Sequence, residues 1–280
     1  MKPAPVRFPL VVGILAVTMI PVAVRANISG FGDFSQFTIN VDDSGSAPTL
    51  SPGSIRLTNN TGLESRSVFY NTPQSISQFS ASFTYQNAGV TYPNSGNNGI
   101  YGATFCLQNS AAGAAAVCGN GVNAFGYGNE PFSPGIGTSA AVTFEMQPPP
   151  TLSGLYTNGN LGGGSSNTSP VNLVSGDPIN VTLIYNGLVL HESLFDTVTS
   201  QSYDAFFAAN LPSILGGPTA FVGVTASTGN SNTSSGSDGF QTFSNFQFNA
   251  GVAPEPASLT VLLMGAGAIG MARPRKKARC

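Results

Sequence analysis

The sequence predicts an all-β protein, a large antiparallel two-sheet sandwich, and three observations support this fold class. Short runs rich in Phe, Val, Ile, Thr and Tyr alternate with polar residues from Asn27 to Ala250, which is the period of half-buried strands. Gly (34) and Pro (20) interrupt these runs often. Helical periodicity is nearly absent, and only residues 202–217 are expected to form a helical turn or two.

The expected strands follow one another in order, separated by turn residues. They span 31–40, 54–60, 77–87, 101–109, 139–147, 179–196, 219–227 and 240–249. Asn186 and Gly187 lie between two alternating apolar runs, which is the strongest short signal for a β-hairpin. The Gly/Ser/Asn-rich stretches 157–170 and 227–239 lie inside this series, so we interpret them as long loops and not as domain boundaries.

Charge is scarce and unevenly distributed. Charged residues make up 8% of the 280 residues, against about 25% in an ordinary soluble domain. Between Asn27 and Ala253 the chain has two bases, Arg56 and Arg66, and eleven acids, which leaves a net charge of −9. Nucleic-acid backbones need basic partners, so we expect no nucleic-acid binding by this span.

Residues 1–26 are predicted to be a signal peptide. A basic start precedes an apolar run from Phe8 to Val24, and Val24 and Ala26 occupy the −3 and −1 positions of a cleavage before Asn27. Because the run is near the shortest that can span a bilayer, an uncleaved membrane anchor is the alternative. We expect the chain to be exported.

Residues 251–280 form a distinct C-terminal segment. Pro254, Glu255 and Pro256 precede an uncharged run over 257–272, which a basic tail over 273–280 follows. As a helix this run would measure roughly 24 Å, short of a hydrocarbon core of about 30 Å, but flanking bases can snorkel and bilayers can thin. Five bases would hold the tail in the cytoplasm: Arg273, Arg275, Lys276, Lys277 and Arg279.

The order and spacing of these three parts resemble the PEP-CTERM sorting signal of Gram-negative bacteria. The resemblance implies transient anchoring in the inner membrane and processing by an exosortase-type protease near the Pro-Glu-Pro. It also implies delivery to the cell surface or to an extracellular, exopolysaccharide matrix. The two prolines favour an extended stretch that a membrane-embedded protease can reach. An ordinary tail anchor with incidental prolines is the alternative.

The interpretation of the cysteines follows from the expected export of the chain. Cys106 and Cys118 flank an eleven-residue stretch in the exported part of the chain, where disulfides persist. A bridge that closes so short a loop contributes about 3 kcal/mol in the chain-entropy model. We predict this disulfide, with two reduced thiols as the alternative. Cys280 lies beyond the apolar run and is expected to be reduced, or removed with the tail.

The strand series of the body resembles the L-type (legume-lectin-like) domain of bacterial surface proteins. The stretches that carry the resemblance are "ISGFGDFSQFTIN", "GATFCLQN", "AFGYGN", "AAVTFEMQ", "VTLIYNGLVL" and "FVGVTASTG". The resemblance covers nearly the whole body, residues 27–250. It implies a concanavalin-like jelly roll of two large antiparallel sheets, with loops at one end that can bind sugar.

The sequence departs from this family at the positions that hold metal and sugar. The sugar-binding Asp of the family falls on Tyr101, and its paired metal-binding acids fall on Thr143 and Glu145. The stretch 146–160 that follows contains neither Asp nor His. Calcium takes roughly six to eight oxygen ligands, usually several of them charged. We therefore expect no cofactor and no high-affinity metal site of the lectin type.

A Gly-rich stretch still supplies candidates for weak glycan contacts. Phe125, Tyr127 and Asn129, with Asn109 nearby in sequence, offer stacking faces and hydrogen-bonding groups, and Tyr127 is the best single candidate. The alternative is that Phe125 packs in the core, while the neighbouring glycines only supply turn geometry.

No catalytic site is predicted. A glycosidase needs two carboxylates roughly 5–9 Å apart, but no E-x-D or E-x-E pair occurs, and Glu145 stands alone on its strand. Glu192 and Asp196 occupy apparent loop or strand-end positions. His191, the one histidine of the chain, is expected to face away from Glu192, because neighbours alternate sides along a strand.

The sequence therefore predicts a non-enzymatic, exported surface or matrix protein. Its lectin-like sandwich is expected to bind glycan or exopolysaccharide weakly. The alternative is a purely structural surface protein whose sandwich has lost sugar binding.

Overall fold

The structure is a computed structural model that describes residues 27–42, 46–59, 62–89, 101–118, 124–129, 134–146, 150–228 and 239–251. The predicted signal peptide, with Val24 and Ala26, lies outside the described residues. So do the Pro-Glu-Pro stretch, the apolar run 257–272 and the basic tail 273–280. Across the described ranges, no helix has the length and apolar character that crossing a bilayer requires.

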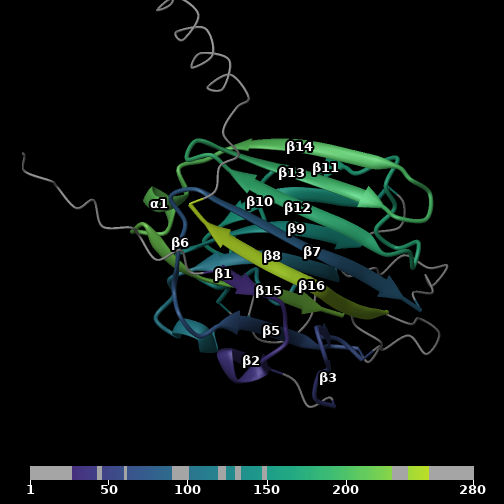
Figure 1. The fold of residues 1–280 in the computed structure, drawn as a ribbon, viewed down its shortest axis with the longest axis horizontal. Coiled ribbons are helices and arrows are strands. Elements are labelled where there is room, and N and C mark those ends of the chain that lie inside the picture. Colours follow the sequence, from purple (N-terminus) through teal and green to yellow (C-terminus); the bar gives the residue numbers. More distant parts are fainter. Residues whose placement is uncertain are drawn as a thin grey trace, which may run out of the picture.

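Two antiparallel sheets pack face to face (Figure 1). Sheet I has the order β14 (Ser202–Ala208), β13 (Val189–Asp196), β12 (Ile179–Tyr185), β7 (Phe79–Ala88), β16 (Phe240–Ala250), β4 (Ser54–Arg56) and β3 (Thr49–Ser51), and β1 (Asn27–Ser29) pairs with β16. Sheet II has the order β11 (Ser166–Asn167), β10 (Leu152–Thr157), β9 (Ser139–Met146), β8 (Tyr101–Gln108), β15 (Thr219–Ser227), β5 (Ser65–Tyr70) and β2 (Phe37–Val41), and β6 (Gln74–Ser75) pairs with β15. The predicted all-β, antiparallel two-sheet sandwich is confirmed.

The helical content is small. Within the described ranges it consists of α1 (Leu211–Ile214) and two 3₁₀ turns, Phe34–Gln36 and Gly113–Ala115. The stretch 202–217 was expected to be helical, but its first half is the edge strand β14, and the helix is confined to α1. Asn210 caps α1 by accepting a hydrogen bond from the Ser213 amide at 3.1 Å.

The core lies between the sheets and follows the two-residue period of the strands. In β7, Phe79, Ala81, Phe83 and Tyr85 are buried, while the residues between them are partly exposed. Phe83 is central: its ring centroid lies 6.2 Å from that of Phe105 on the opposing sheet. Fully burying an aromatic side chain contributes about 1.5–3 kcal/mol, so this aromatic layer supplies much of the force that holds the sheets together.

The predicted hairpin at Asn186 and Gly187 is confirmed. Its turn is shifted by one residue, because Asn186 and Gly187 are not the two central residues. The Asn186 amide donates to the Val189 carbonyl at 3.2 Å, so Gly187 and Leu188 are the central residues. Gly187 has a φ of +100°, as expected for glycine at the first central position of a type II′ turn. The Asn186 side chain accepts hydrogen bonds from the Leu188 and Val189 amides, both at 2.9 Å.

The sequence suggested a loop or strand-end position for Glu192, and this is wrong. Glu192 lies in the middle of β13, with its side chain buried between the sheets. Ser153 of the opposing sheet donates its hydroxyl to both carboxylate oxygens at 2.8 Å. Burial is the main cause that raises the pKa of Glu192 to about 8. His191 faces the other way, as predicted, and stacks on Phe206 with ring centroids 4.4 Å apart.

Glu192→Gln is expected to raise the melting temperature near pH 8 and to change it little near pH 4. The pKa of Glu192 is about 8, against an ordinary value of 4.5. Between these pH values the folded protein holds a proton that the unfolded chain has released, so the stability of the wild type falls as pH rises. Thermal unfolding of both proteins across this range measures the effect.

The matched control is Asp42→Asn, at an exposed acid. Melting curves of wild type and Glu192→Gln that stay parallel at every pH would contradict the assignment of a buried, protonated Glu192.

Candidate functional site

The outer face of sheet II carries a second apolar cluster. Its buried members are Phe69, Cys106, Ala116, Phe125, Tyr127, Ile136, Ala141 and Tyr156. Some of these side chains stand on β5, β8, β9 and β10, and the others come from described parts of the chain between β8 and β9. Because this cluster covers the outer face while the main core covers the inner face, every residue of β9 is buried.

The Gly-rich stretch belongs to this cluster, which corrects the expectation that its rings face a sugar. Tyr127 is fully buried, and its hydroxyl accepts hydrogen bonds from Ser139 Oγ at 3.0 Å and the Gly159 amide at 3.2 Å. Phe125 is 1% exposed, and its carbonyl accepts a hydrogen bond from Thr225 Oγ1 at 2.6 Å. The structure therefore supports the alternative in which Phe125 packs in the core.

Gly126 explains why the stretch lies so close to the sheet. A Cβ atom at this position would be 2.8 Å from the carbonyl oxygens of both Ala226 and Arg66, and φ is +66°. Glycine thus allows the backbone to lie directly on sheet II. The flanking Phe125 and Tyr127 rings are then buried against the sheet.

The two asparagine candidates lie in different surroundings. Asn109 is half-buried, and its side-chain nitrogen donates to the Leu215 carbonyl at 2.9 Å and the Thr219 carbonyl at 2.7 Å. It therefore ties the end of β8 to the start of β15. Asn129 is exposed, and its backbone amide donates to the Gly159 carbonyl at 2.7 Å. Of the four predicted glycan contacts, Asn129 alone has an exposed side chain.

The predicted Cys106–Cys118 disulfide is not formed in the structure. Cys118 Sγ instead donates a hydrogen bond to the Gly128 carbonyl at 2.6 Å. Cys106 points into the second cluster from β8, and burial raises the pKa of its thiol. Burial thus disfavours the thiolate, which is the form that reacts to make disulfides.

The positions of the paired family acids lie side by side on the outer face of β9, under the second cluster. Glu145 is 4% exposed, and its Oε1 accepts hydrogen bonds from Tyr156 Oη at 2.9 Å and Thr143 Oγ1 at 3.1 Å. Leu152 of β10 pairs directly with Glu145 in the sheet. Two hydroxyl groups therefore donate to this one carboxylate, and an aliphatic residue pairs with it across the sheet.

This donor set does not fit the metal pair of legume lectins. A calcium ion needs roughly six to eight oxygens. Glu145 already accepts two hydrogen bonds, one from the Tyr156 hydroxyl and one from the Thr143 hydroxyl. Throughout the part of the chain that the structure describes, no three His, Cys, Asp or Glu side chains come together. We therefore derive no role for a metal at this position.

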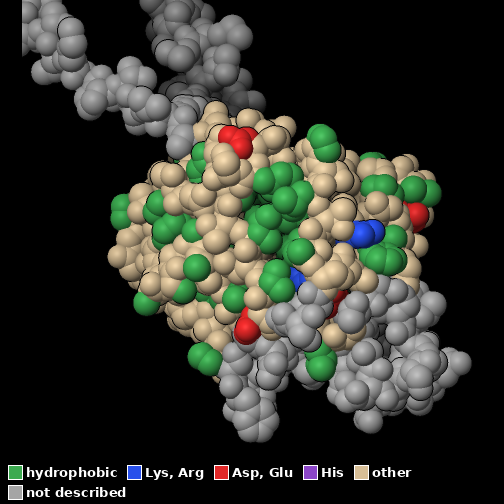
Figure 2. Space-filling view, turned by 90° about the horizontal axis from the view of Figure 1, so that it is seen from below, with side chains coloured by type: hydrophobic (Ala, Val, Ile, Leu, Met, Phe, Trp, Pro, Cys, Tyr) green, Lys and Arg blue, Asp and Glu red, His purple; other side chains and the backbone are tan. Residues whose placement is uncertain are grey.

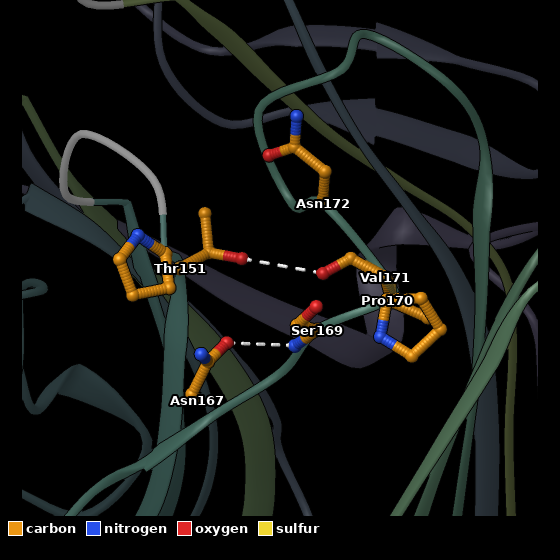
Figure 3. Close-up of a pocket in the computed structure, with 7 residues that line it drawn as sticks. Thr151, Asn167, Ser169, Pro170, Val171 and Asn172 are labelled. Atoms are coloured by element: carbon orange, nitrogen blue, oxygen red, sulfur yellow. Dashed lines mark hydrogen bonds between the residues drawn. The ribbon is translucent and has the colours of Figure 1, made fainter.

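A pocket of about 390 Å³ lies at the outer edge of sheet II, beside β10 and β11 (Figure 3). It lies between the start of β10 and the segment that follows β11, and it is lined by Pro150, Thr151, Asn167, Ser169, Pro170, Val171 and Asn172. No lining residue carries a charge. No sequence motif distinguishes these residues, since runs of Asn, Ser, Thr and Pro are typical of any loop.

The described surface of the body offers few charges to a ligand. Arg66 is buried, with its guanidinium 2.6 Å from Glu64 Oε1. Arg56 lies over the Phe240 ring, with its guanidinium carbon 4.9 Å from the ring centroid. Figure 2 shows one face of the molecule, on which charged side chains are few and scattered. The chemistry that this surface presents is that of amides, hydroxyls and isolated apolar groups.

Titration of Ca²⁺ into the purified protein is expected to give no micromolar binding isotherm. The reason is the donor set around Glu145, in which Thr143 stands where a second carboxylate would be needed. Isothermal titration calorimetry measures this directly. The matched variant Thr143→Asp restores the second acid, and a strong isotherm from the wild type would contradict our interpretation of the site.

Comparisons with known proteins agree with this geometry. The PEP-CTERM protein-sorting motif matches residues 252–276, and no curated protein sequence matches the chain. Lectin II from Ulex europaeus is 16% identical, with a TM-score of 0.62 over 81% of this chain and 98% of its own. Basic winged bean lectin is 18% identical, with a TM-score of 0.62 over 81% and 97%.

Arcelin-5 from Phaseolus vulgaris, described as a lectin-like defense protein, is 15% identical, with a TM-score of 0.61 over 81% of this chain and 98% of its own. At these identities the likeness shows the fold alone. The chain therefore has the legume-lectin fold, a jelly roll of two antiparallel sheets, and carries a PEP-CTERM sorting motif behind it.

Proposed function

We propose that this protein is exported by a Gram-negative bacterium, sorted to the cell surface or extracellular matrix, and binds neutral glycan or exopolysaccharide weakly. The PEP-CTERM motif over 252–276 is the observation that carries this proposal. In it, residues 1–26 direct export, 27–250 form the lectin-like body, and 251–280 anchor the chain transiently in the inner membrane. An exosortase-type protease then processes the tail near Pro254, Glu255 and Pro256.

The fold supports the glycan part of the proposal. Among the structural neighbours, a lectin named UEA-II is described in complex with galactose, and basic winged bean lectin with Tn-antigen. The body of this chain presents an uncharged, amide-rich pocket, and both of its arginines contact other side chains. These features suit a neutral saccharide better than an anionic one, because an anionic ligand needs cationic partners.

The protein is proposed to be non-enzymatic. The buried carboxylates Glu145 and Glu192 lie on opposite faces of sheet II, Glu145 under the second cluster and Glu192 between the two sheets. Within the described ranges, each has hydroxyl partners and neither lines the pocket. A glycosidase instead needs two carboxylates that flank a bound glycosidic bond.

A purely structural surface protein is the second candidate, and two observations favour it. The rings that were predicted to stack on sugar, Phe125 and Tyr127, are buried, and Thr143 stands where the family resemblance implies an acid on β9. A sandwich without these contacts can still serve as a rigid, weakly charged component of a matrix.

Glycan-array binding separates these two candidates. The full-length chain, purified in a detergent without a sugar head group, is expected to bind a subset of neutral glycans with dissociation constants in the millimolar range, about −4 kcal/mol. Because Tyr127 is buried, Tyr127→Ala would disturb packing and does not test a surface contact. Asn129→Ala tests the one exposed residue of the four predicted contacts, and unchanged binding excludes Asn129 as a contact. Silence across the array would favour the purely structural role.

Mass analysis of the mature C-terminus tests the sorting proposal independently. In cells that carry an exosortase, the mature protein is expected to end close to Pro256, because processing occurs near the Pro-Glu-Pro. Replacing Pro254 and Pro256 with Ala is expected to leave the precursor uncut. Mature wild-type protein that retains the basic tail would refute the processing step.

A further inference from the structure

We propose that the pocket beside β10 and β11 is a metal-independent binding site for a neutral mono- or disaccharide. This inference rests on the proposed glycan-binding function and places it at one site. The pocket measures about 390 Å³, near the small end of the roughly 300–1,000 Å³ typical of ligand pockets. That size suits one or two sugar rings and excludes a buried longer chain.

The pocket has a fixed floor. The hydroxyl groups of Thr151 and Thr168 form a hydrogen bond with an oxygen–oxygen distance of 2.6 Å. The Thr168 amide also donates to the Thr151 carbonyl at 2.9 Å. Thr168 Oγ1 also donates to the Val171 carbonyl at 2.9 Å. Both threonines are buried. The segment that forms one wall is therefore fastened to the start of β10 before any ligand arrives, which reduces the entropy cost of binding.

Two asparagine side chains present donors at the pocket. Asn167 Oδ1 accepts a hydrogen bond from the Ser169 amide at 2.8 Å (Figure 3), and Asn172 Oδ1 accepts one from the Val174 amide at 3.2 Å. These bonds fix the orientation of both side chains. Each side-chain nitrogen keeps its two N–H donors, and within the described residues neither donates a hydrogen bond to protein.

The remaining wall is apolar or neutral. Pro150 and Pro170 present C–H surface, Val171 is buried behind them, and Ser169 adds a hydroxyl that can donate or accept. A sugar ring has the matching character, with hydroxyls along its rim and C–H groups on its faces. With no charged residue in the lining, the pocket gives an anionic sugar such as a uronic acid no compensating cation.

The site is separate from the acid positions of the family and needs no metal. Thr143 and Glu145 lie under the second cluster and do not line the pocket. The lining supplies amide, hydroxyl and carbonyl groups but no carboxylate. Binding here is therefore expected to be insensitive to chelators.

Saturation-transfer NMR on the full-length chain, in a detergent without a sugar head group and with excess EDTA, tests the proposal. The probes are galactose, N-acetylgalactosamine and glucose, with galacturonic acid as the anionic match of galactose. At least one neutral sugar is expected to show transfer, and galacturonic acid none. The double variant Asn167→Ser/Asn172→Ser keeps an oxygen to cap each turn but removes both amide donors, and it should weaken binding about ten-fold or more.

The matched control is Asn160→Ser. Asn160 is exposed outside the pocket and caps the Gly162 amide in the same way, at 2.8 Å, so this variant should bind like the wild type. Ser169→Leu, which fills the pocket and leaves both asparagines, should also abolish transfer, and unchanged melting temperatures confirm folding. If the double variant and Ser169→Leu both bind a neutral sugar as tightly as the wild type, the assignment of the pocket is wrong, but the proposed glycan function is not. Absence of transfer from every neutral sugar, together with a silent glycan array, overturns the glycan function itself.

Discussion

Phe83 stands at the centre of the aromatic layer that joins the two sheets, with Phe105 and Phe144 on one side and Phe243 and Phe246 on its own sheet. Packing of this layer commits the inward positions of the long strands to apolar side chains. Buried polar side chains interrupt this pattern, among them Glu192, to whose carboxylate Ser153 donates, and Arg66, which pairs with Glu64. Recognition of a ligand is consequently left to the outer faces and to the edges of the sheets.

On sheet II the outer face is closed as well. The glycine at 126 lets the Gly-rich stretch lie on the sheet, and the rings beside it complete a second core. Glu145 is enclosed by the same cluster and is satisfied by the hydroxyls of Tyr156 and Thr143. The two positions at which the family resemblance places paired acids, Thr143 and Glu145, are therefore covered by protein side chains. The edge of sheet II carries an uncharged pocket beside β10 and β11.

The sequence was sufficient to predict the fold class, most strands, the hairpin at Asn186 and the outward orientation of His191, because a two-residue period and turn residues are local signals. It missed β5, where Arg66 takes an inward position and is neutralised by Glu64, which breaks the apolar alternation. It missed β14, whose consecutive aromatic residues lie on an edge strand. The burial of Tyr127, the unbridged Cys106 and the pocket depend on contacts between segments that are distant in sequence, and composition does not encode them.

Amide hydrogen exchange across the Gly-rich stretch measures the central claim most directly, because the claim is that this stretch is core and not an open binding loop. The Tyr127 amide donates to the Ala124 carbonyl at 2.7 Å and the Ile136 amide to the Tyr127 carbonyl at 2.9 Å. Both amides are expected to exchange as slowly as those of β9, with or without added saccharide. Exchange at the rate of an unprotected chain, slowed when a sugar is added, would contradict the account and return the binding site to this stretch.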